Sequence, residues 1–175
     1  GDNALGANTT ASNNTAVGAS ALLANTSGTS SVAVGHQALD SNTTGSNNTA
    51  VGKDSLASNT TGASNVAVGT NALEANTTSS SSTAIGYNSL TANTAVSNTA
   101  VGKDSLESNS SGARNTAVGA DALAANTTAS DNVAVGKAAL AANTTGTTNV
   151  AVGTYALDAN TCLLYTSDAA DEEDS

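Results

Sequence analysis

A glycine that recurs at a nearly fixed interval constrains the fold of this chain more than any other feature. Successive copies lie 17 residues apart except for one step of 16, and a leucine and an asparagine recur in the same register. One unit reads G-x-x-[AS]-L-x-[AS]-N-T-T-G-x-x-N-[TV]-A-V. The recurring glycines are Gly1, Gly18, Gly35, Gly52, Gly69, Gly86, Gly102, Gly119, Gly136 and Gly153. A repeat of fixed length predicts that each unit stacks on the next.

The unit is too short for most repeat folds. Seventeen residues cannot hold a strand, a crossover helix and a second strand, and a leucine-rich repeat needs roughly 20–29 residues. Segments such as Asn14–Gly18 and Ser31–Gly35 alternate on a period of two, which favours a short strand ending at the glycine. We therefore predict an all-β fold: a parallel β-solenoid or β-roll with one 17-residue repeat per coil and about ten coils.

The direction of each side chain follows less directly from the pattern. Val32 and Val34 share one face of their strand, and we expect them to point inward with the recurring leucine while Ala33 faces a neighbouring chain. Residues 36–42 could form a second short strand or one helical turn. The Asn-Thr-Thr-Gly segment that follows has turn residues, and we expect its glycine to supply a positive φ.

The short step between Gly86 and Gly102 lacks one residue between Asn93 and Asn98. We expect this segment to be a surface turn that tolerates a change in length.

The composition predicts a thin core and an oligomer. There is no Phe, Trp, Met or Pro, and Tyr occurs three times. Each coil then has one leucine, one Val or Ile and many alanines to bury, and stacked coils also need their ends covered. A parallel homo-oligomer would supply the missing contacts, because cyclic symmetry closes such an interface.

Charge argues against several classes of partner. Charged residues make up 10% of the chain, compared with roughly 25% in typical domains. The net charge is −10 and only four residues are Lys or Arg, so we expect no nucleic-acid partner. No apolar run approaches the roughly 18 residues of a membrane span, and we expect no membrane insertion in this segment.

The pattern also argues against catalysis. His36 is the only histidine, and its position after the glycine is filled by unrelated residues in other units. No nucleophile and base accompany it, so we predict no catalytic residue. Acidic residues occur singly without a calcium-loop pattern, and every phosphate-loop motif is absent, so we expect no metal and no cofactor.

The asparagine that precedes Thr-Thr allows three readings. We expect a ladder of stacked side-chain amides along the rod. The same triplet matches the glycosylation sequon, which an Asn- and Thr-rich composition produces by itself. The sequon positions are Asn8, Asn42, Asn59, Asn76, Asn126 and Asn143. Ice binding by a flat hydroxyl-bearing face is a third reading, but adjacent threonines such as Thr43 and Thr44 would point to opposite faces.

Segments Ser31–Gly35 and Asn65–Gly69 resemble the S-V-A-I-G motif of YadA-like heads in trimeric autotransporter adhesins. The resemblance covers nearly all of residues 1–161 and implies a left-handed β-roll with three chains side by side. The family repeat is about three residues shorter and lacks the regular leucine and the Asn-Thr-Thr-Gly segment. Similar repeats also occur in phage tail-fibre-like proteins, often upstream of a self-cleaving chaperone.

Residues 162–175 do not continue the repeat. The string 162–172 resembles a translated sequencing adapter, and five acids lie in the last eight residues. We expect a repeat domain over 1–161, truncated at both ends, and a non-native or disordered acidic tail over 162–175.

These observations predict a non-enzymatic rod in an extracellular homotrimeric fibre, attached to a bacterial surface or a virion, that binds host-surface protein or glycan. The alternatives are a phage tail-fibre shaft and an ice-binding solenoid. Irregular positions are the candidate surface contacts. They are His36, Gln37, Lys53, Asp54, Tyr87, Asn88, Lys103, Asp104 and Tyr155.

Overall fold

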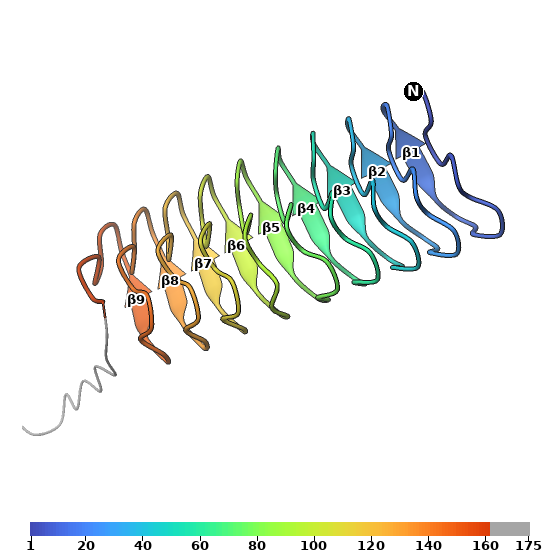
Figure 1. Ribbon diagram of the computed structural model, residues 1–175. Coiled ribbons are helices and arrows are strands. Elements are labelled where there is room, and N and C mark those ends of the chain that lie inside the picture. The colour runs from blue at the N-terminus through green and yellow to red at the C-terminus, as the bar shows by residue number, and fades with distance from the viewer. Residues whose placement is uncertain (162–175) are drawn as a thin grey trace, which may run out of the picture.

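A computed structural model describes residues 1–161 as a rod of stacked coils (Figure 1). Nine strands of three residues each form one parallel sheet in which the strands follow their order in the sequence. They are β1 (Thr15–Val17), β2 (Val32–Val34), β3 (Thr49–Val51), β4 (Val66–Val68), β5 (Thr83–Ile85), β6 (Thr99–Val101), β7 (Thr116–Val118), β8 (Val133–Val135) and β9 (Val150–Val152). The predicted all-β parallel solenoid with one repeat per coil is confirmed.

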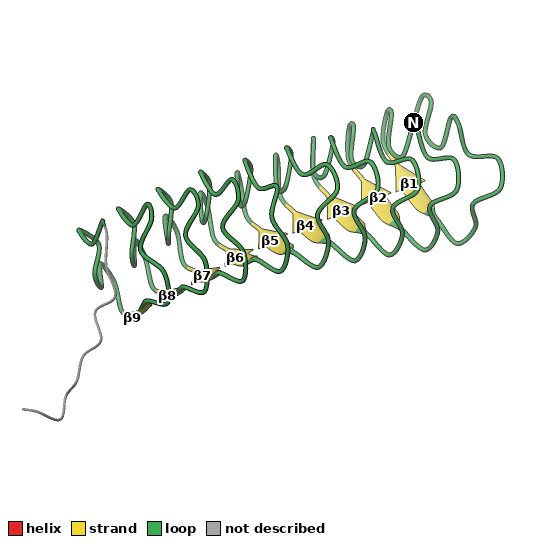
Figure 2. Cartoon of the chain, turned by 60° about the horizontal axis from the view of Figure 1, so that its bottom comes forward, coloured by secondary structure: helices red, strands yellow, loops and turns green. Residues whose placement is uncertain are grey.

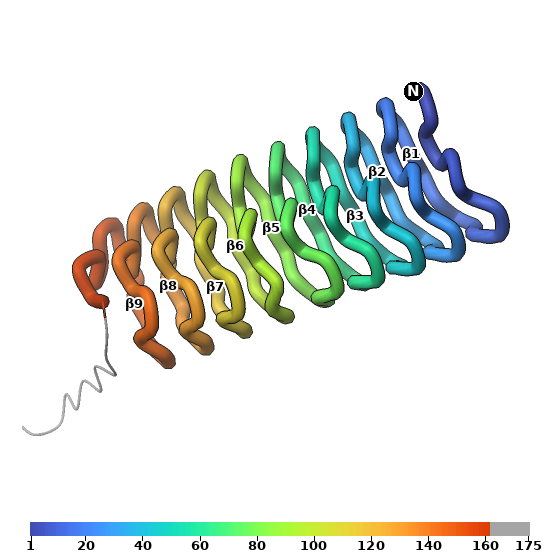
Figure 3. The backbone as a smooth tube through the Cα atoms, in the orientation of Figure 1, coloured from blue at the N-terminus to red at the C-terminus, as the bar shows by residue number. Residues whose placement is uncertain are grey.

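The coils stack in register, as the backbone trace makes plain (Figure 3). Nine strands bound about eight turns, fewer than the roughly ten expected from the glycines, because each strand precedes its glycine and none precedes Gly1. At about 4.8 Å per step the sheet extends roughly 40 Å along the rod. The predicted acidic tail over 162–175 lies outside the described residues.

The strands point their alanines inward, which corrects the expected orientation. The middle residue of each strand from β2 to β8, such as Ala33 or Ala50, is fully buried, while flanking residues such as Val32 and Val34 remain partly exposed. The interior also holds the leucine column and a small residue before each leucine. Because a short coil encloses a narrow cross-section that the leucine already fills, only a methyl group fits opposite it.

The segment after each strand forms a run of turns, neither a second strand nor a helix (Figure 2). Gln37 and Leu39 have φ of 57° and 54°, and the N–H groups of Ala38 and Asp40 donate to the carbonyls three residues back, at 3.5 and 3.3 Å. A left-handed leucine costs roughly 1–2 kcal/mol. Burial of the side chain and a 3.0 Å bond from Leu39 N to Ser55 O in the next coil offset this cost.

Two glycine columns have different roles. Gly52 has φ of 139°, and a Cβ there would lie 2.5 Å from Gly69 O, so the conformation and the stacking both require glycine. Gly45 does not supply the positive φ expected of it; that conformation falls on Asn47, at 60°. A Cβ on Gly45 would instead lie 2.3 Å from Gly62 O, so close approach is what favours glycine there.

Candidate functional site

The outward surface of the sheet, which we call the sheet face, is the most regular exposed feature of the rod. Every strand presents its first and third residues there, and all of these are Val, Ile or Thr. Val17, Val51, Ile85 and Val152 are exposed by 56, 36, 40 and 70%. The uncharged side chains of successive strands therefore form a continuous strip along the outer surface of the sheet.

The sheet pairing repeats this strip without a shift. Thr49 pairs with Val66 and Val51 with Val68, and the same register holds from β1 to β9. Strand spacing of about 4.8 Å then sets the distance between successive side chains in each column. The sheet face can offer apolar contacts at a fixed interval, and it carries no ionisable group for chemistry.

A second region of each coil, which we call the Asn-Thr edge, contains the asparagine that precedes Thr-Thr and the turn that follows it. Asn42 Nδ2 donates to Asn25 Oδ1 at 2.9 Å and to Gly45 O at 3.0 Å. Asn59 repeats both contacts, donating to Asn42 Oδ1 at 2.8 Å and to Gly62 O at 3.0 Å. The predicted amide ladder is therefore confirmed, and its members from Asn25 to Asn143 are completely buried.

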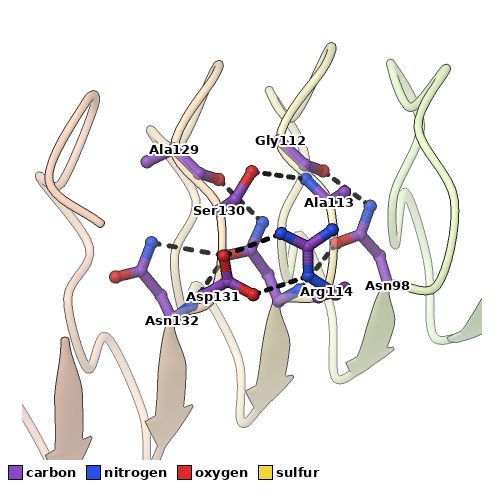
Figure 4. A network of polar contacts seen from close by, with 9 residues as sticks. Asn98, Gly112, Ala113, Arg114, Ala129, Ser130, Asp131 and Asn132 are labelled. Atoms are coloured by element: carbon purple, nitrogen blue, oxygen red, sulfur yellow. Dashed lines mark hydrogen bonds and ion pairs between the residues drawn. The ribbon is translucent and has the colours of Figure 1, made fainter. Parts of the chain in front are cut away.

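A second column of Asn or Ser lies just before each strand. Asn48 Oδ1 accepts a hydrogen bond from Asn65 N at 3.0 Å, and Asn48 Nδ2 donates to Gly62 O at 2.8 Å. The carbonyl of Gly62 thus accepts from both asparagine columns. Figure 4 shows the equivalent bond from Asn98 Nδ2 to Gly112 O, at 2.8 Å. These buried amides cross-link the coils and leave no sequon amide exposed from Asn42 to Asn143.

The paired threonines divide their roles. Thr43 Oγ1 donates to Thr60 O at 3.0 Å, and Thr60 Oγ1 donates to Thr77 O at 3.0 Å. Thr44 and Thr61, the second members, are exposed. The first threonine therefore forms a hydroxyl string between coils, which accounts for its regular position without any ligand.

The predicted contact residues lie on one ridge, at the first and second positions after the strand glycines. His36, Lys53, Tyr87, Lys103 and Tyr155 are exposed, whereas Gln37, Asp54, Asn88 and Asp104 are half-buried. The fold brings some together: Lys53 pairs with Asp54 and Lys103 with Asp104, and His36 Nδ1 lies 4.0 Å from Asp54 Oδ1. Lys137 Nζ lies 5.5 Å from the centre of the Tyr155 ring.

The electrostatics of this ridge are those of surface ion pairs. A hydrogen bond to Asp54 raises the pKa of Lys53, and a hydrogen bond to Asp104 raises the pKa of Lys103. Partial burial raises the pKa of Asp40, although His36 opposes this shift. Exposed pairs of this kind stabilise a fold only slightly.

Within residues 1–161 no pocket forms and no three His, Cys, Asp or Glu side chains gather closely enough to hold a metal ion. The part of the chain that the structure describes also has no helix long and apolar enough to cross a membrane.

One ion pair was missed by the sequence reasoning. Arg114 Nε donates to Asp131 Oδ1 at 2.7 Å and Arg114 Nη2 to Asp131 Oδ2 at 2.9 Å, across two neighbouring coils (Figure 4). The hydrogen bonds from Arg114 lower the pKa of Asp131. The signal was available, because the two residues occupy the same position of consecutive units, 17 residues apart.

Comparison with protein-family models, curated proteins and solved structures found no match to this chain.

Proposed function

We propose that this chain is a rod segment of an extracellular homotrimeric fibre that serves attachment and performs no catalysis. The observation that carries the proposal is the sheet face: an uncharged, β-branched strip that runs from β1 to β9 and remains partly exposed in a single chain. Continuous apolar strips of this kind mark protein interfaces. The sheet faces of parallel copies would bury one another, and the same contact would recur at every coil.

We propose three chains because the repeat resembles those of trimeric adhesin heads. Closed cyclic symmetry would leave the ridge with His36, Lys53 and Tyr87 pointing away from the axis, available to a host-surface protein or glycan. Each contact would be shallow, and repetition over three chains would supply avidity. Such a fibre would belong on a bacterial surface or a virion.

The oligomeric state tests the proposal. We expect light scattering of the full chain to give three times the mass of one chain. Val68→Lys, on the sheet face, should reduce that mass, because a buried unpaired ammonium group is costly. Thr61→Lys, on the exposed Asn-Thr edge, is the matched control and should leave the mass unchanged. A cooperatively melting monomer would contradict the proposal.

Ice binding by the same face is the second candidate. The objection to it was that the paired threonines are adjacent, but the outward residues are Thr or Val at one position and Val or Ile two residues later. This flat array of methyl and hydroxyl groups repeats at each strand. Thermal hysteresis of the concentrated protein tests it. Ice binding would be favoured over the trimer if the protein is a monomer that shows thermal hysteresis and if Val68→Lys abolishes that hysteresis. If the concentrated protein shows no thermal hysteresis, ice binding is eliminated.

A further inference from the structure

The short coil between Gly86 and Gly102 is the only irregular step of the rod within residues 1–161. On the sheet side nothing changes there: Thr83 pairs with Thr99 and Ile85 with Val101 in the usual register. The leucine column also continues, since Leu90 N donates to Ser105 O at 3.0 Å. The missing residue is therefore accommodated entirely on the Asn-Thr edge.

The amide ladder is interrupted at this step. Asn76 Nδ2 donates to Asn59 Oδ1 at 2.9 Å, and Asn109 Nδ2 donates to Asn93 Oδ1 at 2.8 Å. Asn76 Oδ1, which would accept from Asn93, is fully buried and has no partner. Asn93 turns its amide to Ala95 O instead, at 2.7 Å.

The next acceptor of this kind without a partner is Asn143 Oδ1, and Asn160 Nδ2, on the last rung of the described residues, has no partner either. Asn76 is thus the interior rung at which the ladder breaks.

Two further series stop at the same place. Thr60 N and Thr61 N both donate to Thr77 O, at 2.7 and 3.3 Å, but among the described residues no such bond joins Thr77 N or Thr78 N to Thr94 O. The hydroxyl string also skips this step, because Thr94 O accepts from Ser79 Oγ in place of Thr77 Oγ1. Three series of hydrogen bonds are therefore interrupted at one step on one side of the rod, where Ser79 Oγ donates to Thr94 O and Ser82 Oγ donates to Ala95 O, at 3.4 Å, in their place.

We propose that the step from Asn76 to Asn93 is a built-in hinge. It divides the rod into two cooperative blocks that open on the Asn-Thr edge while β5 and β6 stay paired. In a stacked-repeat fold each coil is stabilised by its neighbours, so an interior step that has lost inter-coil bonds opens before the regular steps beside it. A fully buried acceptor without a partner lowers the cost of opening further, because water can reach it only in the open form.

Hydrogen exchange of the full chain, resolved to single amides, tests the hinge. Thr77 and Thr78 follow an asparagine just as Thr60 and Thr61 do, so the two pairs are matched in local sequence. We expect the Thr77 and Thr78 amides to exchange at least about tenfold faster than those of Thr60 and Thr61. Equal rates would overturn the proposal.

Two length variants test the cause. Inserting one threonine after Thr94 recreates the spacing of 126–132, and should slow exchange at Thr77 and Thr78 to the rates of Thr60 and Thr61. Deleting Thr128 should create the same defect two coils later, between Asn109 and Asn126, and accelerate exchange at Ser110 and Ser111, whose N–H groups donate to Thr127 O. Rates that neither change moves would overturn the hinge. If one variant fails to fold, the exchange rates of the other variant and of the unaltered chain still test the hinge.

Discussion

The two sides of the rod differ in what they need from outside the chain. On the Asn-Thr edge, buried amides and hydroxyl groups find partners in the neighbouring coil, as Asn42 and Thr43 do. On the sheet face the backbone is paired, but Val51 and Ile85 keep much of their apolar surface exposed. The bonds on the Asn-Thr edge therefore hold the coils together within one chain, whereas the proposed contact between chains concerns the sheet face.

The largest effect is expected at the glycine that ends each strand. Gly52→Ala would place a methyl group 2.5 Å from Gly69 O at a φ of 139°, and we expect a loss of about 4 kcal/mol in the free energy of unfolding. Gly62→Ala is the matched comparison: its methyl group would lie 2.3 Å from Ser79 O, but its φ is not positive and Ala129 occupies the same column, so we expect a smaller loss of about 2 kcal/mol. Urea unfolding measures both, and similar losses would show that the two columns are not distinct.

The amide ladder should give the next largest effect. Asn59→Ala removes two donated hydrogen bonds and the acceptor of Asn76 Nδ2, and leaves buried groups unpaired. We expect a loss of about 3 kcal/mol in unfolding free energy. Thr61→Ala, on the exposed side of the same turn, should change it by less than about 0.5 kcal/mol. A ladder variant as stable as the unaltered chain would contradict the structural role of the asparagines.

The sequence predicts some features of the coil but not the orientation of every side chain. The strand at Val32–Val34, the inward leucine and the stacked Asn42 and Asn59 all follow from period and residue type. The inward alanine did not, because alternation shows which residues share a face but not which face is inside. That choice depends on the width of the coil, which no local pattern encodes. Hydrophobicity alone predicts that the valines are buried and Ala33 is exposed, but the narrow interior accommodates Ala33 and leaves the valines on the outer face.

The conformation of the turn after each strand could not be predicted from the sequence either. Nothing in the residues of 36–40 indicates that Leu39 adopts a left-handed conformation, since the strain is offset only by stacking against the next coil. The one-residue deletion before Asn98 was visible in the sequence. Its consequence for the buried ladder required knowing that Asn76 and Asn93 are neighbours in space.

The smallest effect is expected at the exposed pair between coils. Arg114 holds the pKa of Asp131 below its ordinary value of 3.8. The pair's contribution to stability is therefore present above pH 3.8 and is lost as the pH falls through the lowered pKa. Because both groups are exposed, this contribution is small. In Arg114→Ala, an NMR titration should show the pKa of Asp131 rising toward 3.8, and an unchanged pKa would rule out the pairing in solution.

Thiol protection on the two sides of the rod tests the proposal that the sheet face is covered by copies of the chain. Val51→Cys places a small thiol on the sheet face, where the valine is 36% exposed in one chain, and Thr61→Cys places one on the Asn-Thr edge. Both changes are made in a Cys162→Ser background. We expect a bulky thiol reagent to label Val51→Cys at least about tenfold more slowly than Thr61→Cys, a factor equivalent to about 1.4 kcal/mol. Equal labelling rates in the folded protein would contradict the claim.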